Sequence, residues 1–155
     1  LFIDKKTIYP IGKWIHAENH PTKGFAKRPG IHCGEICSAP WLMSANGTYK
    51  SQRGKTWKRV WCEVECNTAI DYSDVVEKLP KKCFVDHITE NGFYKFREAG
   101  INRIWMITDK IKIVRIITEE ERIQILENIG YNEVKEFEPY KKKIEKRMNV
   151  NNIQN

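Results

Sequence analysis

Side chains that alternate in polarity between positions 60 and 66 constrain the fold of this chain most strongly. Valines and cysteines take every second position there, and tryptophan or glutamate takes the positions between: Val60, Cys62, Val64 and Cys66 against Trp61, Glu63 and Glu65. A period of two residues is typical of a strand with one buried face. We therefore predict a central strand over 56–66, with the valines and cysteines in the core.

Other segments rich in β-branched and aromatic residues lie before and after this strand. They cover 2–3, 7–9, 13–18, 93–96, 104–107 and 111–116. Only Thr108, Asp109 and Lys110 separate the last two segments, and so short a connection is typical of a β-hairpin. Antiparallel pairing is therefore expected to dominate the sheet.

Two helices are predicted from signals at their ends. Ser73 can cap a short helix over 74–79 that ends before Pro80. Thr118 and Glu121 have the spacing of a capping box, and Gly130 is a typical stop for the helix that follows. The order of elements predicts an α+β fold, mainly an antiparallel sheet with one or two short helices and a C-terminal capped helix.

Length and composition fit a globular protein. The chain has 155 residues, of which 41% are hydrophobic and 30% charged, and these values are ordinary for one globular domain. We expect a single α+β domain over 1–138. Residues 139–155 are polar and basic, and we expect a tail there that is either helical or disordered.

Charge and hydropathy bear on partners and location. No apolar run approaches the ~20 residues that span a membrane, and the start of the chain has no signal-peptide pattern. We therefore expect no membrane contact and a cytoplasmic location. The formal net charge is +7, which favours acidic partners such as nucleic acid.

The cysteines are predicted to be reduced thiols. Their number, five, is odd, and without a secretory signal a disulfide framework is not expected. Cys62 and Cys66 stand about 13 Å apart on a strand that rises ~3.3 Å per residue, which is too far for one shared zinc ion. We expect no metal and interpret the cysteines as small buried hydrophobes.

The segment from Arg28 to Gly34 is the best candidate for a working surface. Pro29 fixes the backbone, while Gly30 and Gly34 permit a sharp turn and the close approach of a ligand. An imidazole held beside a guanidinium, as His32 is beside Arg28, suits a site for phosphate or ribose. The alternative is structural: His32 caps a backbone carbonyl, and Arg28 pairs with a surface acid.

Glu63, Glu65 and Trp61 share one face of the predicted 56–66 strand. A carboxylate beside a bound sugar stabilises an oxocarbenium-like centre or orients a nucleophile. An aromatic surface stacks on a base or a nicotinamide. The alternative is an ordinary solvated sheet face.

Several motifs together resemble an uncharacterised domain family of bacteriophage and mobile-element genomes, which includes large multidomain phage proteins. The resemblance covers roughly residues 1–130 and implies no function by itself. The motifs are Tyr9-Pro10-Ile11-Gly12-Lys13-Trp14, Arg28-Pro29-Gly30-Ile31-His32-Cys33-Gly34, Ala39-Pro40-Trp41-Leu42, Val60-Trp61-Cys62-Glu63-Val64-Glu65 and Asn91-Gly92-Phe93-Tyr94-Lys95-Phe96.

The run Gly30-Ile31-His32-Cys33-Gly34 is also similar to the strand-borne histidine motif of ADP-ribosyltransferase-like proteins. In that superfamily the histidine binds the ribose of NAD, and a glutamate on a later strand supports transfer. The resemblance implies NAD as cofactor and His32, with Glu63 or Glu65, as the catalytic residues. The cofactor-binding residues that it implies are Arg28, Gly30, His32, Gly34 and Trp61.

These observations leave three functions open. We expect an ADP-ribosyltransferase-like enzyme of phage or mobile-element origin that binds NAD near His32 and modifies a host protein or nucleic acid in the host cytoplasm. The second function is a non-catalytic module that binds nucleic acid or a nucleotide through Arg28 and His32. The third is a metal-independent ribonuclease that uses His32 with a carboxylate and a lysine.

Overall fold

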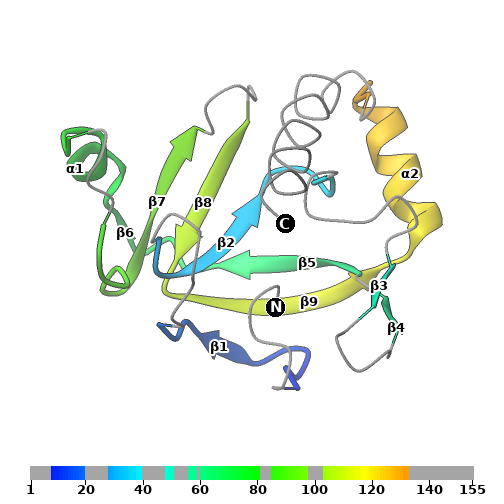
Figure 1. Cartoon of the computed structure of the whole chain (residues 1–155), viewed down its shortest axis with the longest axis horizontal. Coiled ribbons are helices and arrows are strands. Elements are labelled where there is room, and N and C mark those ends of the chain that lie inside the picture. The colour runs from blue at the N-terminus through cyan, green and yellow to red at the C-terminus, as the bar shows by residue number, and fades with distance from the viewer. Residues whose placement is uncertain are drawn as a thin grey trace, which may run out of the picture. The chain divides into compact units, whose positions relative to one another are not determined.

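A computed structural model describes most of the chain (Figure 1). The described residues are 8–19, 28–39, 60–80, 85–97 and 103–132, together with the backbone of 48–50 and 56–58. The tail predicted over 139–155 lies outside them. The chain divides into two compact units, one of Leu1–Glu35 with Cys62–Ile116 and the other of Ile36–Trp61 with Ile117–Asn155.

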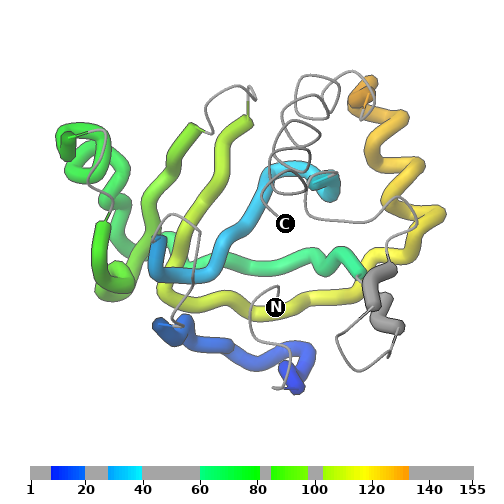
Figure 2. The backbone as a smooth tube through the Cα atoms, viewed as in Figure 1, coloured from blue at the N-terminus to red at the C-terminus, as the bar shows by residue number. Residues whose placement is uncertain are grey.

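The described secondary structure consists mainly of strands, which are the arrows in Figure 1. Figure 2 shows the course of the same backbone as a tube. The strands are β1 (Trp14–His16), β2 (Ile31–Gly34), β3 (Thr48–Lys50), β4 (Thr56–Lys58), β5 (Trp61–Cys66), β6 (Ile70–Asp71), β7 (Gly92–Arg97), β8 (Ile104–Thr108) and β9 (Lys110–Ile117). The helices are α1 (Ser73–Glu77) and α2 (Glu119–Asn128). In the described part of the chain, neither helix is long and apolar enough to cross a membrane.

The first unit contains two sheets. One has the strand order β1-β9-β5 and the other has the order β2-β8-β7-β6. The pairs β1 with β9, β2 with β8 and β7 with β8 are antiparallel, whereas β6 pairs with β7 in parallel. The mainly antiparallel α+β fold predicted from the sequence is therefore confirmed.

The core of this unit joins the two sheets. Its centre is Ile15 on β1, Ile31 on β2 and Ile111 on β9, each no more than 7% exposed. Half-buried side chains from both sheets and from the segments on either side of β1 pack against these three isoleucines: Tyr9, Ala17, Cys33, Val64, Cys66 and Ile113. Because β2 belongs to one sheet and β1, β9 and β5 to the other, we conclude that the inner faces of the sheets meet at this cluster.

The prediction of a β-hairpin at Thr108–Lys110 is wrong, although both of its strands, β8 and β9, are present. β8 and β9 belong to different sheets, and Figure 1 shows the two strands running in different directions. Asp109 is the one residue between them. The backbone N–H of Ala17 donates to the Asp109 carbonyl over 2.7 Å, and the side-chain amide of Asn67 donates to the Asp109 carboxylate over 2.8 Å. These bonds stabilise a corner at which the chain passes from one sheet to the other.

The single strand predicted over 56–66 is two strands instead. β4 pairs with β3, whereas β5 lies at the edge of the three-stranded sheet beside β9. Val60, which the alternation assigned to the core, is 52% exposed. The alternation does hold within β5, where Val64 and Cys66 pack against the core.

Helix α1 begins one residue earlier than predicted. Its first residue, Ser73, donates from its backbone N–H to the carboxylate of Asp71 over 2.9 Å. The hydroxyl and the N–H of Ser73 together hold the pKa of Asp71 below its usual value. The Ser73 hydroxyl also accepts from the Lys95 N–H over 3.0 Å, which ties the helix to β7.

Helix α2 confirms the predicted capping box. The Thr118 hydroxyl accepts from the Glu121 N–H over 3.2 Å, and the Glu121 carboxylate accepts from the Thr118 N–H over 3.0 Å. Gly130 ends the helix with a φ of +67°, and the Tyr131 N–H donates back to the Leu126 carbonyl. This left-handed ending leaves the terminal carbonyls bonded without straining a side chain.

Thr118→Ala is expected to lower the free energy of unfolding by about 1 kcal/mol, because the Glu121 N–H loses its acceptor at the exposed start of α2. Urea denaturation monitored by circular dichroism measures the change. Thr118→Ser keeps the hydroxyl and is the control. Equal losses in both variants would show that the capping bond does not carry the effect.

Candidate functional site

The segment that precedes β2 is held by an unusual backbone conformation. Gly30 has a φ of +130°, which L side chains rarely adopt. A Cβ at this position would lie 2.4 Å from the Cγ2 atom of Ile107, so no other residue fits without displacing a side chain. Gly30 therefore fixes the point at which the chain enters β2 and brings Arg28 against the sheet.

Arg28 and His32 lie together on a surface that includes Phe96. The Arg28 guanidinium carbon lies 4.6 Å from the centre of the Phe96 ring. The His32 ring meets the same ring edge-on, with 6.4 Å between the centroids and 72° between the planes. His32 is exposed, while Arg28 and Phe96 are half-buried. We call Arg28, His32 and Phe96 the Arg28 cluster.

The strand register explains why these residues meet. Both His32 on β2 and Tyr94 on β7 stand opposite Ile107 of β8. Phe96 stands opposite Trp105, two residues along the same strand. Side chains two residues apart on a strand share a face, so His32, Tyr94 and Phe96 project from one face of the four-stranded sheet.

His32 contacts a backbone carbonyl, as a histidine with a structural role commonly does. Its Nε2 atom lies 3.0 Å from the Arg28 carbonyl oxygen. Because a carbonyl can only accept, Nε2 carries the hydrogen, and the neutral ring therefore has its acceptor at Nδ1. The predicted alternative, in which His32 caps a backbone carbonyl, is confirmed, and this bond also fixes the ring beside Arg28.

Tyr94 is a buried tyrosine close to Arg28, and its phenol is neutral. It is 1% exposed, and burial raises its pKa to about 12, although the nearby Arg28 guanidinium acts in the opposite direction. At neutral pH Tyr94 therefore carries no charge that would cancel the charge of Arg28.

Glu63 and Glu65 take part in cross-strand ion pairs. The Arg115 Nε atom lies 2.8 Å from a Glu63 oxygen, and the Lys112 Nζ atom lies 2.8 Å from a Glu65 oxygen. Both glutamates are about half exposed, at 52% and 53% of their side-chain surface. Trp61, the first residue of β5, is half-buried.

The structure does not bring His32 together with these glutamates. Val64 packs in the core between the sheets, so its neighbours Glu63 and Glu65 point away from that core on the three-stranded sheet. Ile31 is in the same core, so His32 points away from it on the four-stranded sheet. The predicted catalytic residues therefore lie on different sheets, each on the face turned away from the shared core.

A second group of cations and an aromatic ring lies on the three-stranded sheet. The ammonium groups of Lys110 and Lys112 lie 5.2 Å and 5.1 Å from the centre of the Trp14 ring. Trp14 is 41% exposed. Lys112 is also the partner of Glu65, so a neighbouring carboxylate offsets part of the positive charge on this surface.

Cys33 and Cys66 face each other between the sheets. The Cys33 thiol hydrogen-bonds to the Cys66 sulfur, which raises the pKa of Cys33, as burial also does. The same bond lowers the pKa of Cys66, against the effect of burial. Gly34, which the sequence assigned to cofactor binding, lines a cavity beside these two thiols.

Phe96 is the functional candidate that sequence reasoning missed. The signal in the sequence was limited to an Asn91-Gly92 turn followed by an aromatic strand, and this predicts a strand but no partner. Only the pairing of β2 and β7 with the same strand brings Phe96 to Arg28 and His32.

No family model, curated protein or solved structure matches this chain. Among the described residues, no group of three or more histidine, cysteine, aspartate or glutamate side chains could hold a metal ion. The function of the candidate site is therefore inferred from the geometry of its residues.

Proposed function

We propose that this chain is a nucleic-acid-binding module whose phosphate contact lies at the Arg28 cluster. The observation that carries the proposal is the position of the Arg28 guanidinium, 4.6 Å from the centre of the Phe96 ring and on the same surface as the exposed His32. No catalytic step is part of the proposal.

The stacking of Arg28 on Phe96 suits a phosphate ligand. A guanidinium that lies on an aromatic ring is held in one orientation, and its planar fork of N–H donors matches phosphate oxygens. Less side-chain entropy is then lost when the ligand binds. His32 adds an exposed ring beside the guanidinium, and its N–H and its ring nitrogen are further polar groups for a ligand.

The charge of the whole chain favours a polymer of phosphates. Lys and Arg exceed Asp and Glu by 27 to 20, a net charge of +7. Neutralising several phosphates at once releases counterions, which supplies much of the affinity of nucleic-acid-binding proteins. A mononucleotide gains far less from such a charge.

The geometry supports an ADP-ribosyltransferase less well. That activity needs His32 and a supporting glutamate at one NAD molecule, but Glu63 and Glu65 pair with Arg115 and Lys112 on the other sheet. A ribonuclease that uses His32 would need a carboxylate and a lysine beside it. We therefore place the binding module first, with the two enzymes as outcomes of the test.

Arg28→Ala is expected to weaken the binding of a single-stranded oligonucleotide about tenfold or more. The reason is that a hydrogen bond to a charged group contributes ~1.5–3 kcal/mol, and ~1.4 kcal/mol corresponds to tenfold in affinity. Fluorescence anisotropy at several salt concentrations measures this, and the slope of log affinity against log salt should fall by about 1. Arg28→Lys keeps the charge but not the fork, so its affinity should lie between those of Arg28→Ala and the unaltered chain.

Lys78→Ala is the matched control, because Lys78 is an exposed cation at the end of α1. It removes the same charge from another place and should weaken binding much less. Equal losses in Arg28→Ala and Lys78→Ala would contradict a specific phosphate contact. A thermal stabilisation of the unaltered chain by NAD that His32→Ala abolishes would favour the transferase instead, and RNA cleavage lost in His32→Ala would favour the ribonuclease.

A further inference from the structure

A small cavity opens beside the thiols of Cys33 and Cys66. Its volume is about 110 Å³, which exceeds the ~30 Å³ that one water molecule occupies in the liquid. Gly34, Lys95 and Met106 also line it. The proposed phosphate contact does not use any of these residues.

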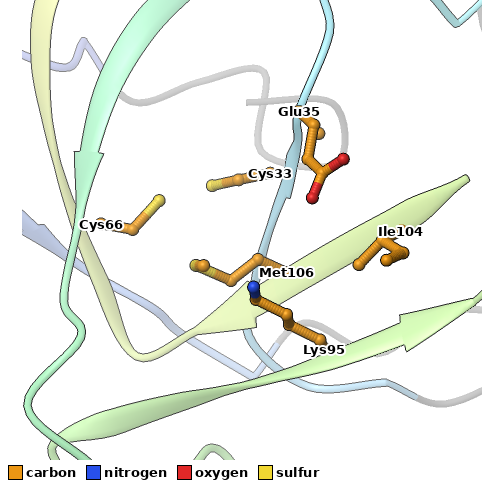
Figure 3. Close-up of a pocket in the computed structure, with 7 residues that line it drawn as sticks. Cys33, Glu35, Cys66, Lys95, Ile104 and Met106 are labelled. Carbon is orange, nitrogen blue, oxygen red and sulfur yellow. The ribbon is translucent and has the colours of Figure 1, made fainter. Parts of the chain in front are cut away.

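Three sulfur atoms from three strands converge on this cavity. Cys33 on β2 and Met106 on β8 are directly opposite each other in the antiparallel register, where Cβ atoms lie ~4.5–5.5 Å apart. Cys66 on β5, which belongs to the other sheet, lines the same cavity as Cys33. Figure 3 shows both cysteine sulfurs and the Met106 thioether directed into the same space.

We propose that this cavity binds one Cu(I) ion through the sulfur atoms of Cys33 and Cys66, with the Met106 thioether as third ligand. Thiolates and thioethers are soft ligands, and they select Cu(I) over harder divalent ions. A structural zinc ion instead takes four ligands from cysteine, histidine and carboxylate side chains. Among the described residues, no three side chains of these kinds are placed so that they could hold a metal ion.

The protons released and the charge of the bound site follow from its ligands. Binding replaces two S–H bonds by two Cu–S bonds and releases two protons to solvent, because only deprotonated cysteines ligate metal. One Cu(I) with two thiolates carries a net charge of −1. The Lys95 ammonium and the Glu35 carboxylate both line the same cavity. Their opposite charges offset each other, so the bound site would keep this single negative charge.

The ion would also join the two sheets of the unit. Cys66 belongs to the three-stranded sheet, whereas Cys33 and Met106 belong to the four-stranded sheet. A ligand that binds only the folded chain stabilises it. Both cysteines are partly exposed, so an ion can reach them without global unfolding.

Anaerobic competition with a chromophoric Cu(I) chelator tests the proposal on the reduced full chain. We expect one tightly bound ion per chain, a raised melting temperature, and X-ray absorption at the copper edge that fits three sulfur ligands. Cys33→Ser and Cys66→Ser should each abolish tight binding. Met106→Leu, which conserves volume, should weaken binding about tenfold, the effect of ~1.4 kcal/mol.

Cys62→Ser is the control, because Cys62 is on the same strand as Cys66 but does not line this cavity. Its binding should equal that of the unaltered chain. Melting curves recorded without metal show whether each variant folds. If a serine variant does not fold, the affinity of Met106→Leu still tests the proposal. Tight Cu(I) binding by the folded Cys33→Ser variant would overturn the proposal. A loss of Cu(I) binding in Cys62→Ser as large as that in Cys33→Ser would overturn it too. So would unchanged affinity in Met106→Leu, or nitrogen and oxygen ligands at the copper edge.

Discussion

Gly30→Ala is expected to lower the free energy of unfolding by about 3 kcal/mol or more, because two costs combine at this position. The first is backbone strain of ~1–3 kcal/mol, since the φ of +130° is in a region that alanine rarely adopts. The second is overpacking, which typically costs ~1–3 kcal/mol. The new Cβ would lie 2.4 Å from the Ile107 Cγ2 atom and 3.2 Å from the Thr108 carbonyl oxygen, and Ile107 is 0% exposed.

Gly12→Ala separates the two costs. Gly12 has a φ of +80°, but no atom of the described residues lies within 4 Å of the Cβ position, so only the ~1–2 kcal/mol of left-handed strain applies. Urea denaturation of both variants measures the difference. Losses of equal size would contradict the steric part of the argument. We also expect Gly30→Ala to weaken oligonucleotide binding, since Arg28 is positioned through Gly30.

Ile107→Ala is expected to destabilise the chain by about 2–5 kcal/mol, the range for removing a buried isoleucine side chain. Ile107 is fully buried at 0% exposure and stands between His32 and Tyr94 in the register of the four-stranded sheet. Its loss leaves a cavity between two strands that carry the Arg28 cluster. Thermal and urea denaturation measure the effect.

Ile107→Val is the graded control for this prediction. It removes one methylene group and should cost only ~0.5–1.5 kcal/mol. If alanine and valine at this position cost the same, the space around Ile107 is not filled by its side chain. In that case Ile107 would not be closely packed between the strands that carry His32 and Phe96.

The parts of the fold that were predicted correctly depend on local signals. The capping box of Thr118 and Glu121 and the stop at Gly130 join residues within one helix, so the sequence alone is sufficient to find them. Most strand segments were also found, because alternation is a property of each strand.

The parts that were missed depend on contacts between distant residues. The short Thr108–Lys110 connection is compatible with a hairpin and with a corner, and hydrogen bonds from Ala17 and Asn67 to Asp109 favour the corner. The candidate site shows the same limit. Arg28 and His32 were identified from their own segment, but Phe96 is brought to them only by the sheet register.

The separation of His32 from Glu63 and Glu65 is a further case. A strand pattern assigns each residue to one face of its own sheet, but it does not say how two sheets face each other. The shared core of Ile31 and Val64 settles this relation.

The position of the ligand on the surface tests the central claim most directly. We would titrate an isotope-labelled chain with a short single-stranded oligonucleotide and follow backbone and aromatic resonances by NMR. We predict that the largest shift changes fall on His32, Phe96 and the Gly30 amide, with smaller ones elsewhere. Changes confined to Trp14, Lys110 and Lys112, with the Arg28 cluster unmoved, would contradict our account and would assign binding to the three-stranded sheet.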